Sequence, residues 1–197
     1  MSTKVVLASN NTGKLKEFQQ LLAEQKLEVL PQAQFNVPEV EETGLSFVEN
    51  AIIKARHASK IAGLPAIADD SGLEVDFLDG APGIYSARFS GADANDAQNN
   101  QKLLERLHDV PDEQRSARFQ CVLVYMRHPL DPTPLICQGT WEGRILTAPQ
   151  GANGFGYDPL FLDPTTGLSS AELSKAEKNT RSHRAKALQG LLAQLSQ

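Results

Sequence analysis

The sequence predicts an α/β protein with a mixed β-sheet. Short apolar runs alternate with amphipathic helical patterns in the early part of the chain, as strands and helices do in α/β proteins. Two longer apolar runs, 117–126 and 135–141, then follow one another, as neighbouring strands do. The chain has 197 residues, of which 41% are hydrophobic and 22% charged, and these values are typical of a globular domain. A chain of this length can form one well-packed domain with a smaller lobe, so we expect one domain over residues 1–197.

The first elements are a strand, a helix and a second strand. Residues 5–8 are four apolar or small residues in a row, which predicts a short buried strand. A helix over about 14–24 follows, with apolar residues three to four positions apart. Residues 27–30 predict the second strand.

The second helix has clear start and stop signals. Ser46 and Glu49 have the spacing of a capping box, with Ser46 as N-cap, and Gly63 is placed to end the helix. Residues 64–68 then enter a third, short buried strand. We expect this strand to end at the turn-forming residues 69–72.

The second half of the chain predicts two helices around the two longer strands. A third helix spans about 93–107, and the proline-rich residues 128–134 join the strands by an open connection rather than a tight hairpin. The end of the chain is helical, and its buried stripe is Leu188, Leu191, Leu192 and Leu195.

Composition excludes several classes of partner. The formal net charge is −5, so the chain has no basic field for duplex nucleic acid, and an anionic ligand must be held by a local cluster of cations. No apolar run is long enough to span a membrane, and the first residues lack the layout of a signal peptide. Cys121 and Cys137 could face each other across a strand pair, but we interpret them as buried thiols. We expect a soluble, cytoplasmic protein.

The turn between the first strand and the first helix predicts a phosphate site. A strand-to-helix turn points backbone N–H groups and a helix N-terminus at one spot, and a lysine there opposes the helix dipole by about 0.3–1 kcal/mol. Lys14 therefore suits a bound anion better than it suits helix stability. The pattern is not a Walker A loop, because Ala8 and Leu15 stand where that motif has glycine and Ser or Thr. A surface turn with a solvated lysine is the alternative.

Acidic residues predict a metal site. Asp69 and Asp70 lie where a buried strand is expected to end, which is the usual place for active sites in α/β proteins. Adjacent residues of an extended strand point to opposite faces, so only one of the two should face a shared centre. Asp70 with one carboxylate of the loop residues Glu39, Glu41 and Glu42 would suit Mg²⁺, which needs only one or two carboxylates beside substrate phosphates. The alternative is that residues 69–72 form a simple turn.

A second polar group lies near the end of the chain. Lys178, His183 and Arg184 are basic, and the last two would lie in the first turns of a helix that begins near Thr180. Phe155, between glycines, can stack on a planar base, and Asp158 can accept from ring N–H groups. A solvated helix face and an aromatic residue that fills the core are the alternatives. Together the signals predict a nucleoside triphosphate site.

Seven separated motifs, which lie between residues 9 and 184, resemble those of one family, and the resemblance runs in order from residue 5 to about 192. They are Ser9-Asn10-Asn11-Thr12-Gly13-Lys14, Glu41-Glu42-Thr43-Gly44, Phe47-Val48-Glu49-Asn50-Ala51, Ala68-Asp69-Asp70-Ser71-Gly72-Leu73, Ala81-Pro82-Gly83-Ile84-Tyr85-Ser86-Ala87-Arg88, Gly154-Phe155-Gly156-Tyr157-Asp158-Pro159 and Ser182-His183-Arg184. This set resembles the bacterial inosine/xanthosine triphosphate pyrophosphatases, which remove deaminated purine nucleotides. One departure is Asn10, where many members have glycine.

The resemblance implies Mg²⁺-dependent hydrolysis between the α- and β-phosphates of ITP, dITP or XTP, which gives a nucleoside monophosphate and pyrophosphate. It also implies an elongated α/β fold, a long mixed sheet with flanking helices that form two lobes around a central cleft, and a homodimer. By matching motif, Glu41 and Asp70 would bind the metal, and Asp70 would also be the general base. The substrate would be bound by Ser9, Asn10, Asn11, Thr12, Gly13, Lys14, Ser71, Phe155, Gly156, Tyr157, Asp158, Lys178, His183 and Arg184.

Chemistry supports the purine selectivity. A 6-oxopurine has an acceptor where adenine has an amino donor, so lysine or arginine donors favour the former. An unpaired buried donor costs about 1–3 kcal/mol, which is enough for useful discrimination. Two alternatives remain: a Maf-like pyrophosphatase for pyrimidine or methylated nucleotides, and a non-catalytic nucleotide-binding protein.

Overall fold

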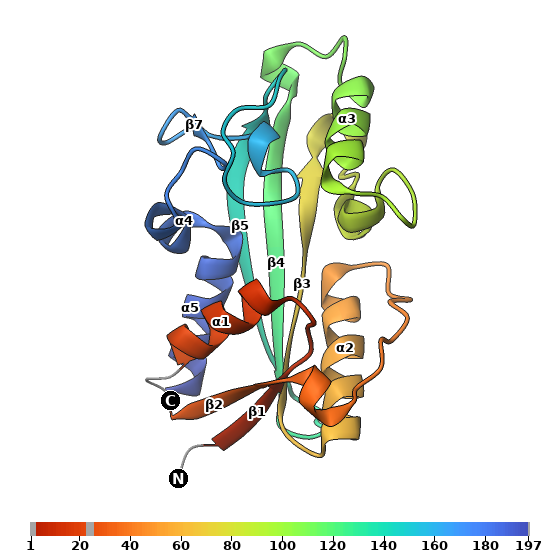
Figure 1. The fold of residues 1–197 in the computed structure, drawn as a ribbon, viewed down its shortest axis with the longest axis vertical. Helices are drawn as coiled ribbons and strands as arrows, with labels where there is room; N and C mark the ends of the chain where they lie inside the picture. The colour runs from red at the N-terminus through yellow and green to blue at the C-terminus, as the bar shows by residue number, and fades with distance from the viewer. Residues whose placement is uncertain (1–2, 23–25, 197) are drawn as a thin grey trace. The chain divides into compact units, whose positions relative to one another are not determined.

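The computed structural model describes residues 3–22 and 26–196. The predicted end of the first helix, near residue 24, lies outside these residues. The strands of Figure 1 are β1 (Thr3–Leu7), β2 (Leu27–Pro31), β3 (Ala66–Val75), β4 (Ser116–Met126), β5 (Leu135–Ile145), β6 (Phe161–Asp163) and β7 (Leu168–Ser169). The helices are α1 (Thr12–Leu22), α2 (Phe47–Ala62), α3 (Asp96–Arg106), α4 (Lys175–Arg181) and α5 (His183–Leu195).

The strands form one mixed sheet in the order β2-β1-β3-β4-β5-β6-β7. β1 pairs in parallel with both β2 and β3, whereas β6 pairs antiparallel with β5 and β7. The prediction of an α/β fold with a mixed sheet and flanking helices is therefore confirmed. Among the described residues, no helix combines the length and apolar character that a membrane crossing requires.

The chain divides into two compact units. Unit 1 comprises Met1–Asp70, Cys121–Gln138 and Ala187–Gln197, and unit 2 comprises Ser71–Gln120 and Gly139–Lys186. Each unit has its own hydrophobic core, and each is described separately below.

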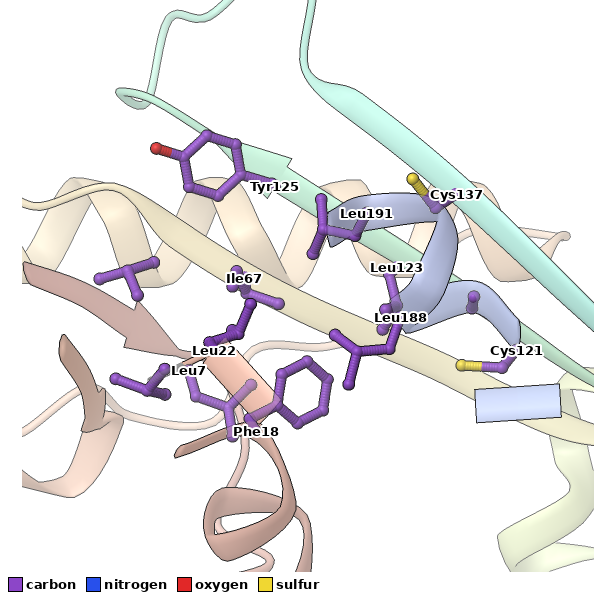
Figure 2. Close-up of a cluster of buried hydrophobic side chains, with 13 residues drawn as sticks. Leu7, Phe18, Leu22, Ile67, Cys121, Leu123, Tyr125, Cys137, Leu188 and Leu191 are labelled. Carbon is purple, nitrogen blue, oxygen red and sulfur yellow. The ribbon is translucent and has the colours of Figure 1, made fainter. Parts of the chain in front are cut away.

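In unit 1, helices cover both faces of the sheet. Side chains of β1 and β3 alternate between two cores, since Leu7 and Ile67 pack with α1 and α5 while Val6 and Ala68 pack with α2. Figure 2 shows the first of these cores, in which Leu188 and Leu191 of α5 confirm the predicted buried stripe. The second core uses the alanines of α2, whose small side chains let the helix lie close to the sheet.

Both cysteines belong to the first core. Cys121 and Cys137 are buried thiols on the neighbouring strands β4 and β5, and Figure 2 shows them beside α5. Burial raises the pKa of the Cys137 thiol above its usual value. The interpretation as buried thiols is consistent with this environment.

The ends of α2 follow the sequence signals. Ser46 has an extended backbone, and its side chain accepts a hydrogen bond from the N–H of Glu49. Gly63 ends the helix with φ of 65°, the left-handed conformation that glycine adopts most readily. The predicted cap and stop are confirmed.

Unit 2 is centred on aromatic residues and one buried arginine. Phe161 lies with its ring centroid 4.5 Å from that of Phe119 and 5.1 Å from that of Trp141. Arg115 is 2% exposed, and its guanidinium donates to the carbonyls of Leu107, Val110, Ile145 and Leu146. The bond to Leu107 satisfies a carbonyl at the C-cap of α3, and the bonds to Ile145 and Leu146 tie the end of β5 to the same guanidinium.

Three predicted boundaries differ from the structure, and two short strands were not predicted. β3 does not end at residues 69–72 but continues to Val75, because Leu73 and Val75 are buried in the core of unit 2 and the strand keeps β4 as its neighbour. α3 starts at Asp96, since Asn95 forms a capping box with Gln98, and β5 extends to Ile145. The short strands β6 and β7 were not predicted.

Candidate active site

The turn after β1 is organised by Asn11, which caps α1. Its Oδ1 accepts hydrogen bonds from the backbone N–H of Gly13 at 2.9 Å and of Lys14 at 3.0 Å, and the N–H of Asn11 donates to Ser9 Oγ at 3.1 Å. We expected backbone N–H groups of this turn to bind an anion, but these three already donate hydrogen bonds within the turn. The positive charge that the turn offers a ligand is therefore that of the Lys14 side chain.

Asn10 needs no special backbone. It does not have a positive φ, so the conformation here is open to residues other than glycine. Its Oδ1 accepts a hydrogen bond from Nε2 of the buried Gln32 at 2.8 Å. The asparagine that replaces the usual glycine thus holds the turn to the residue that follows β2.

Asp69 and Asp70 each pair with a lysine, and the two lysines come from different helices. Asp69 Oδ2 lies 2.7 Å from Lys14 Nζ of α1, and Asp70 Oδ1 lies 2.8 Å from Lys54 Nζ of α2. Since α1 and α2 cover opposite faces of the sheet, the two carboxylates point to opposite faces, as expected for adjacent strand residues. Both aspartates are buried.

The acidic loop contributes Glu42 to this cluster. Glu42 Oε1 lies 3.1 Å from Lys54 Nζ, so one ammonium group pairs with two carboxylates. Glu41, by contrast, is exposed. Of the three loop glutamates that the sequence left open, Glu42 is therefore the one in contact with the partner of Asp70. The assignment of Glu41 stays a prediction.

Burial and charge shift both members of the Lys54–Asp70 pair. Burial raises the pKa of the Asp70 carboxyl above its usual range, and the nearby Lys54 ammonium only partly opposes this effect. Burial alone would lower the pKa of the Lys54 amine, but the surrounding carboxylates, with Asp70 foremost, outweigh burial and raise it. Lys54 thus remains charged, while Asp70 is a stronger proton acceptor than an ordinary aspartate.

A pocket of about 310 Å³ opens in unit 1. Its volume is within the usual range for small-molecule sites. Both lysines line it, together with the carboxylates of Asp69, Glu39 and Glu42. The turn after β1 and the acidic loop supply most of the other lining residues. The lining residues are Ala8, Ser9, Asn10, Lys14, Gln32, Pro38, Glu39, Val40, Glu42, Lys54, His57 and Asp69.

The carboxylates fit a metal ion that also binds the substrate. Among the described residues, no three His, Cys, Asp or Glu side chains are grouped so as to hold a metal by themselves. Asp70 Oδ2, however, is buried and has no hydrogen-bond partner among these residues. An unpartnered buried acceptor is costly, and a hard divalent cation with one or two carboxylates and ligand oxygens would satisfy it.

In unit 2, Asp158 organises the glycine-rich loop. Its Oδ2 accepts from the N–H of Phe155 at 2.9 Å and from Lys178 Nζ at 2.7 Å, and its Oδ1 accepts from Ser170 Oγ at 2.7 Å. The carboxylate predicted to bind a base is therefore occupied by donors of its own unit. In this structure it fixes Phe155 and Lys178 relative to one another.

The other predicted residues of unit 2 differ in accessibility. Phe155 is 59% exposed, whereas Tyr157 is buried and its hydroxyl donates to the carbonyl of Ser86 at 2.8 Å. Burial, with a smaller effect of the Asp96 charge, raises the pKa of the Tyr157 hydroxyl. Tyr157 thus anchors the loop, and Phe155 is the aromatic residue available for stacking.

His183 and Arg184 lie in the first turn of α5, but the predicted helix start near Thr180 is wrong, because Thr180 belongs to α4 and Ser182 separates the two helices. The ring of His183 stacks on that of Phe119, with centroids 4.9 Å apart and planes at 18°. Arg184 Nη2 lies 3.4 Å from Ser71 Oγ. These contacts bring Ser71 and Arg184, predicted from distant motifs, together within unit 2.

Sequence reasoning assigned no role to Lys54 or to His57. Both line the pocket, and His57 Nε2 lies 2.9 Å from the carbonyl oxygen of Pro38. A signal for Lys54 was present, because it stands three and four positions from Ala51 and Ala58 on the apolar stripe of α2. A lysine on a buried stripe implies a buried charge partner.

The fold and the site define an α/β enzyme with a pocket of paired lysines and carboxylates beyond the carboxyl ends of parallel strands. The chain belongs to the Ham1 family, whose model matches residues 5–194.

Relatives of high identity share this family. The dITP/XTP pyrophosphatase of Vibrio cholerae is 62% identical over 188 residues, which cover 95% of this chain and 94% of that protein. The dITP/XTP pyrophosphatase of Escherichia coli strain K12 is 59% identical over 189 residues, which cover 96% of each.

Solved structures agree with the fold. A HAM1 protein from Coxiella burnetii is 52% identical, with a TM-score of 0.95 and 98% of both chains covered. A nucleoside-triphosphatase, or dITP/XTP pyrophosphatase, from Mycobacterium abscessus is 44% identical, with a TM-score of 0.80 and coverage of 96% of this chain and 99% of that one.

Proposed function

We propose that this protein hydrolyses non-standard purine nucleoside triphosphates, namely dITP, ITP and XTP or dXTP. Water would cleave the α–β phosphoanhydride bond and release a nucleoside monophosphate and pyrophosphate, so that deaminated purines leave the nucleotide pool. Relatives named dITP/XTP pyrophosphatases, about 60% identical over nearly the whole chain, support this activity. One NTP pyrophosphatase domain over residues 1–197 remains our proposal for the organisation of the chain.

The observation that carries the proposal is the environment of Asp70. Its Oδ1 is held by Lys54, while its buried Oδ2 has no hydrogen-bond partner among the described residues. A structural salt bridge alone would not require this second oxygen to stay unsatisfied. An oxygen of this kind suits a metal ligand or a general base, and both roles belong to phosphoanhydride hydrolysis.

We propose that Mg²⁺ is the metal, and that Asp70 and Glu42 hold it. When bound, Mg²⁺ would neutralise charge on the phosphate oxygens. Glu42 replaces Glu41 in this assignment because Glu42 is paired with Lys54 and lines the pocket. Lys54 would keep both carboxylates in place and reduce their mutual repulsion.

The chain's own groups would do the remaining work. Lys14 would leave Asp69 and pair with phosphate oxygens, because a phosphate carries more negative charge than one carboxylate. Ser9 and Asn10, which also line the pocket, would donate to the same oxygens. Asp70 would take the proton of the attacking water, and its raised pKa makes it a better acceptor for that proton.

We assign the base to the cluster of unit 2. Phe155 would stack on the purine ring, and Lys178, held by Asp158, would donate to the 6-oxo group. Adenine has an amino donor at that position, so the Lys178 ammonium would face another donor and would form no hydrogen bond with the base. His183 and Arg184 would complete this cluster beside Ser71.

The purified protein should be incubated with Mg²⁺ and, separately, with ITP, dITP, XTP, dATP, GTP, UTP or dTTP, and pyrophosphate release should be measured. We expect fast turnover of the first three and little of the others. Equal turnover of ITP and dATP, or no turnover of ITP, would refute the proposal. Preference for UTP or dTTP would instead indicate a Maf-like enzyme, and ITP binding without hydrolysis a non-catalytic protein.

We further propose a cytoplasmic homodimer. The two buried cysteine thiols are consistent with a reducing compartment. Sedimentation velocity at micromolar concentration would give the mass, and a monomer would contradict the second part of this proposal.

A further inference from the structure

The first two turns of α3 hold the loop that carries Phe155. The N–H of Gly156 donates to Asp96 Oδ2 at 2.7 Å, and Asn100 Nδ2 donates to the carbonyl of Gly156 at 2.7 Å. Asp96 and Asn100 stand four positions apart in the chain, so they lie on the same face of the helix. Both polar groups of the Gly156 backbone are thus bound from one helix face.

The bonded loop has a backbone that few sequences would adopt unaided. Gly154 and Gly156, on either side of Phe155, have φ of +80° and +62°. The N–H of Phe155 itself is bound by Asp158. The loop is therefore fixed on both sides of Phe155, by Asp158 before it and by Asp96 and Asn100 after it.

This fixation contrasts with the exposure of the Phe155 side chain. A large apolar side chain that is 59% exposed gains little from core packing, so the core does not explain why its backbone is held so firmly. The orientation of the Asn100 amide also leaves its buried Oδ1 without a hydrogen-bond partner among the described residues. Its amide group is oriented so that Nδ2 serves Gly156 and the carbonyl of Asp96.

We propose that Asp96 and Asn100 are positioning residues that set base selectivity by fixing the presentation of Phe155. This inference rests on the proposed function, since it assumes that Phe155 stacks on the purine. Because the loop is already held in one conformation, little conformational entropy is lost when the Phe155 ring stacks on a base. It also sets where the 6-position of the base meets Lys178, which Asp158 ties to the same loop.

Asn100→Asp is the sharpest test, because the new side chain has the same shape and cannot donate to Gly156. Gln101→Glu is the matched control: it adds the same charge one position along α3, where the Gln101 amide donates to Glu105 of the same helix. We expect Asn100→Asp to raise KM for ITP by about fivefold or more and to leave kcat unchanged. This increase corresponds to the loss of one hydrogen bond. The ratio of kcat/KM for ITP to that for dATP should fall to a similar extent, because adenine is the base with a donor at the 6-position.

Asp96 is tested by two substitutions. Asp96→Ala should reproduce the rise in KM, whereas Asp96→Asn keeps an acceptor for the N–H of Gly156 and should restore most of the wild-type selectivity. Inhibition by inorganic tripolyphosphate, which has no base, should be the same in all variants. A loss shared equally by ITP, dATP and tripolyphosphate would mean a general structural role and would overturn the inference.

Hydrogen exchange of residues 153–158 measures the hold on the loop without any substrate. Asn100→Asp should speed exchange by about fivefold, and Gln101→Glu should not. Faster exchange with unchanged KM and selectivity would overturn the inference while the proposed function stands. A wild-type protein that is inactive on ITP would instead overturn the proposed function, and the exchange result would still report the hydrogen bonds.

Discussion

The ammonium group of Lys54 lies 2.8 Å from Oδ1 of Asp70, and the same group lies 3.1 Å from Glu42. One helix residue thus joins the carboxylate of a strand to that of a loop. The contact occupies only one oxygen of Asp70, and the other has no hydrogen-bond partner among the described residues.

Asp70→Asn should lower kcat by about a hundredfold to ten-thousandfold, the usual contribution of a general base. The amide cannot accept the proton of water, but it keeps the shape of the site. Triphosphate binding, measured by calorimetry with a non-hydrolysable ITP analogue, should therefore be largely retained. Near-normal turnover would show that Asp70 is neither the base nor a metal ligand.

Glu42→Gln and Glu41→Gln form a pair that separates two adjacent glutamates. Loss of the Glu42 charge should raise the Mg²⁺ concentration needed for half-maximal activity by about 10–100-fold, as for other groups that support a metal. Glu41 is exposed, and its substitution should leave the Mg²⁺ dependence unchanged. The reverse order would favour the assignment made from the motif alone.

Lys178→Ala should reduce the preference for ITP over dATP by about fivefold to a hundredfold, since the donor to the 6-oxo group is lost. Inhibition by tripolyphosphate should change less. Lys175 is an exposed lysine of the same helix, so Lys175→Ala is the control for net charge. A loss of phosphate affinity without a loss of base selectivity would contradict the assigned role.

Asp131→Asn should lower the thermal stability of unit 1. The side chain of Asp131 is fully buried and accepts from the side chain of Arg127 and from the N–H of Thr133, contacts that place its pKa far below the usual range. Because the folded-state pKa is depressed, this stabilisation is present above the unfolded value of about 3.9 and is lost as pH falls. The difference in Tm between wild type and variant should therefore shrink below about pH 4. A pH-independent difference would rule out the charge as its origin.

Gly154→Ala and Gly156→Ala separate backbone strain from steric conflict. A Cβ at Gly156 meets nothing within 4 Å, so only the left-handed backbone at φ +62° should cost about 1–2 kcal/mol. A Cβ at Gly154 would lie 2.0 Å from Asp158 Oδ2, so this variant should lose more stability. Urea unfolding of the two variants would measure the difference, and equal losses would argue against the contact with Asp158.

The sequence predicted those parts of the fold whose signals are local. The start of α2 at Ser46 and its end at Gly63 depend on residues within one helical turn, and they were located correctly. The end of β3 was not, because the turn-forming residues at 69–72 are held in a strand by partners distant in sequence. Tertiary pairing overrode local preference there.

The candidate site shows the same division. Lys14, Asp70 and Phe155 could be proposed from residue type and position alone. The role of Asn11 as a helix cap and the pairing of Lys54 with Glu42 depend on how side chains meet in space. The spacing of residues along the chain does not predict such contacts between separate elements. The hydrogen bonds from α3 to Gly156 could not be predicted for the same reason.

The boundaries of the two units carry a practical consequence for dissection of the protein. The chain passes from one unit to the other between residues 70 and 71, 120 and 121, 138 and 139, and 186 and 187. These points fall inside β3, β4, β5 and α5, so none coincides with a linker. A cut at any one of these four points would sever a strand or α5, and no single cut separates the residues of one unit from those of the other. Phosphate and base recognition must therefore be probed by point substitution in the full-length chain, not by expression of separate halves.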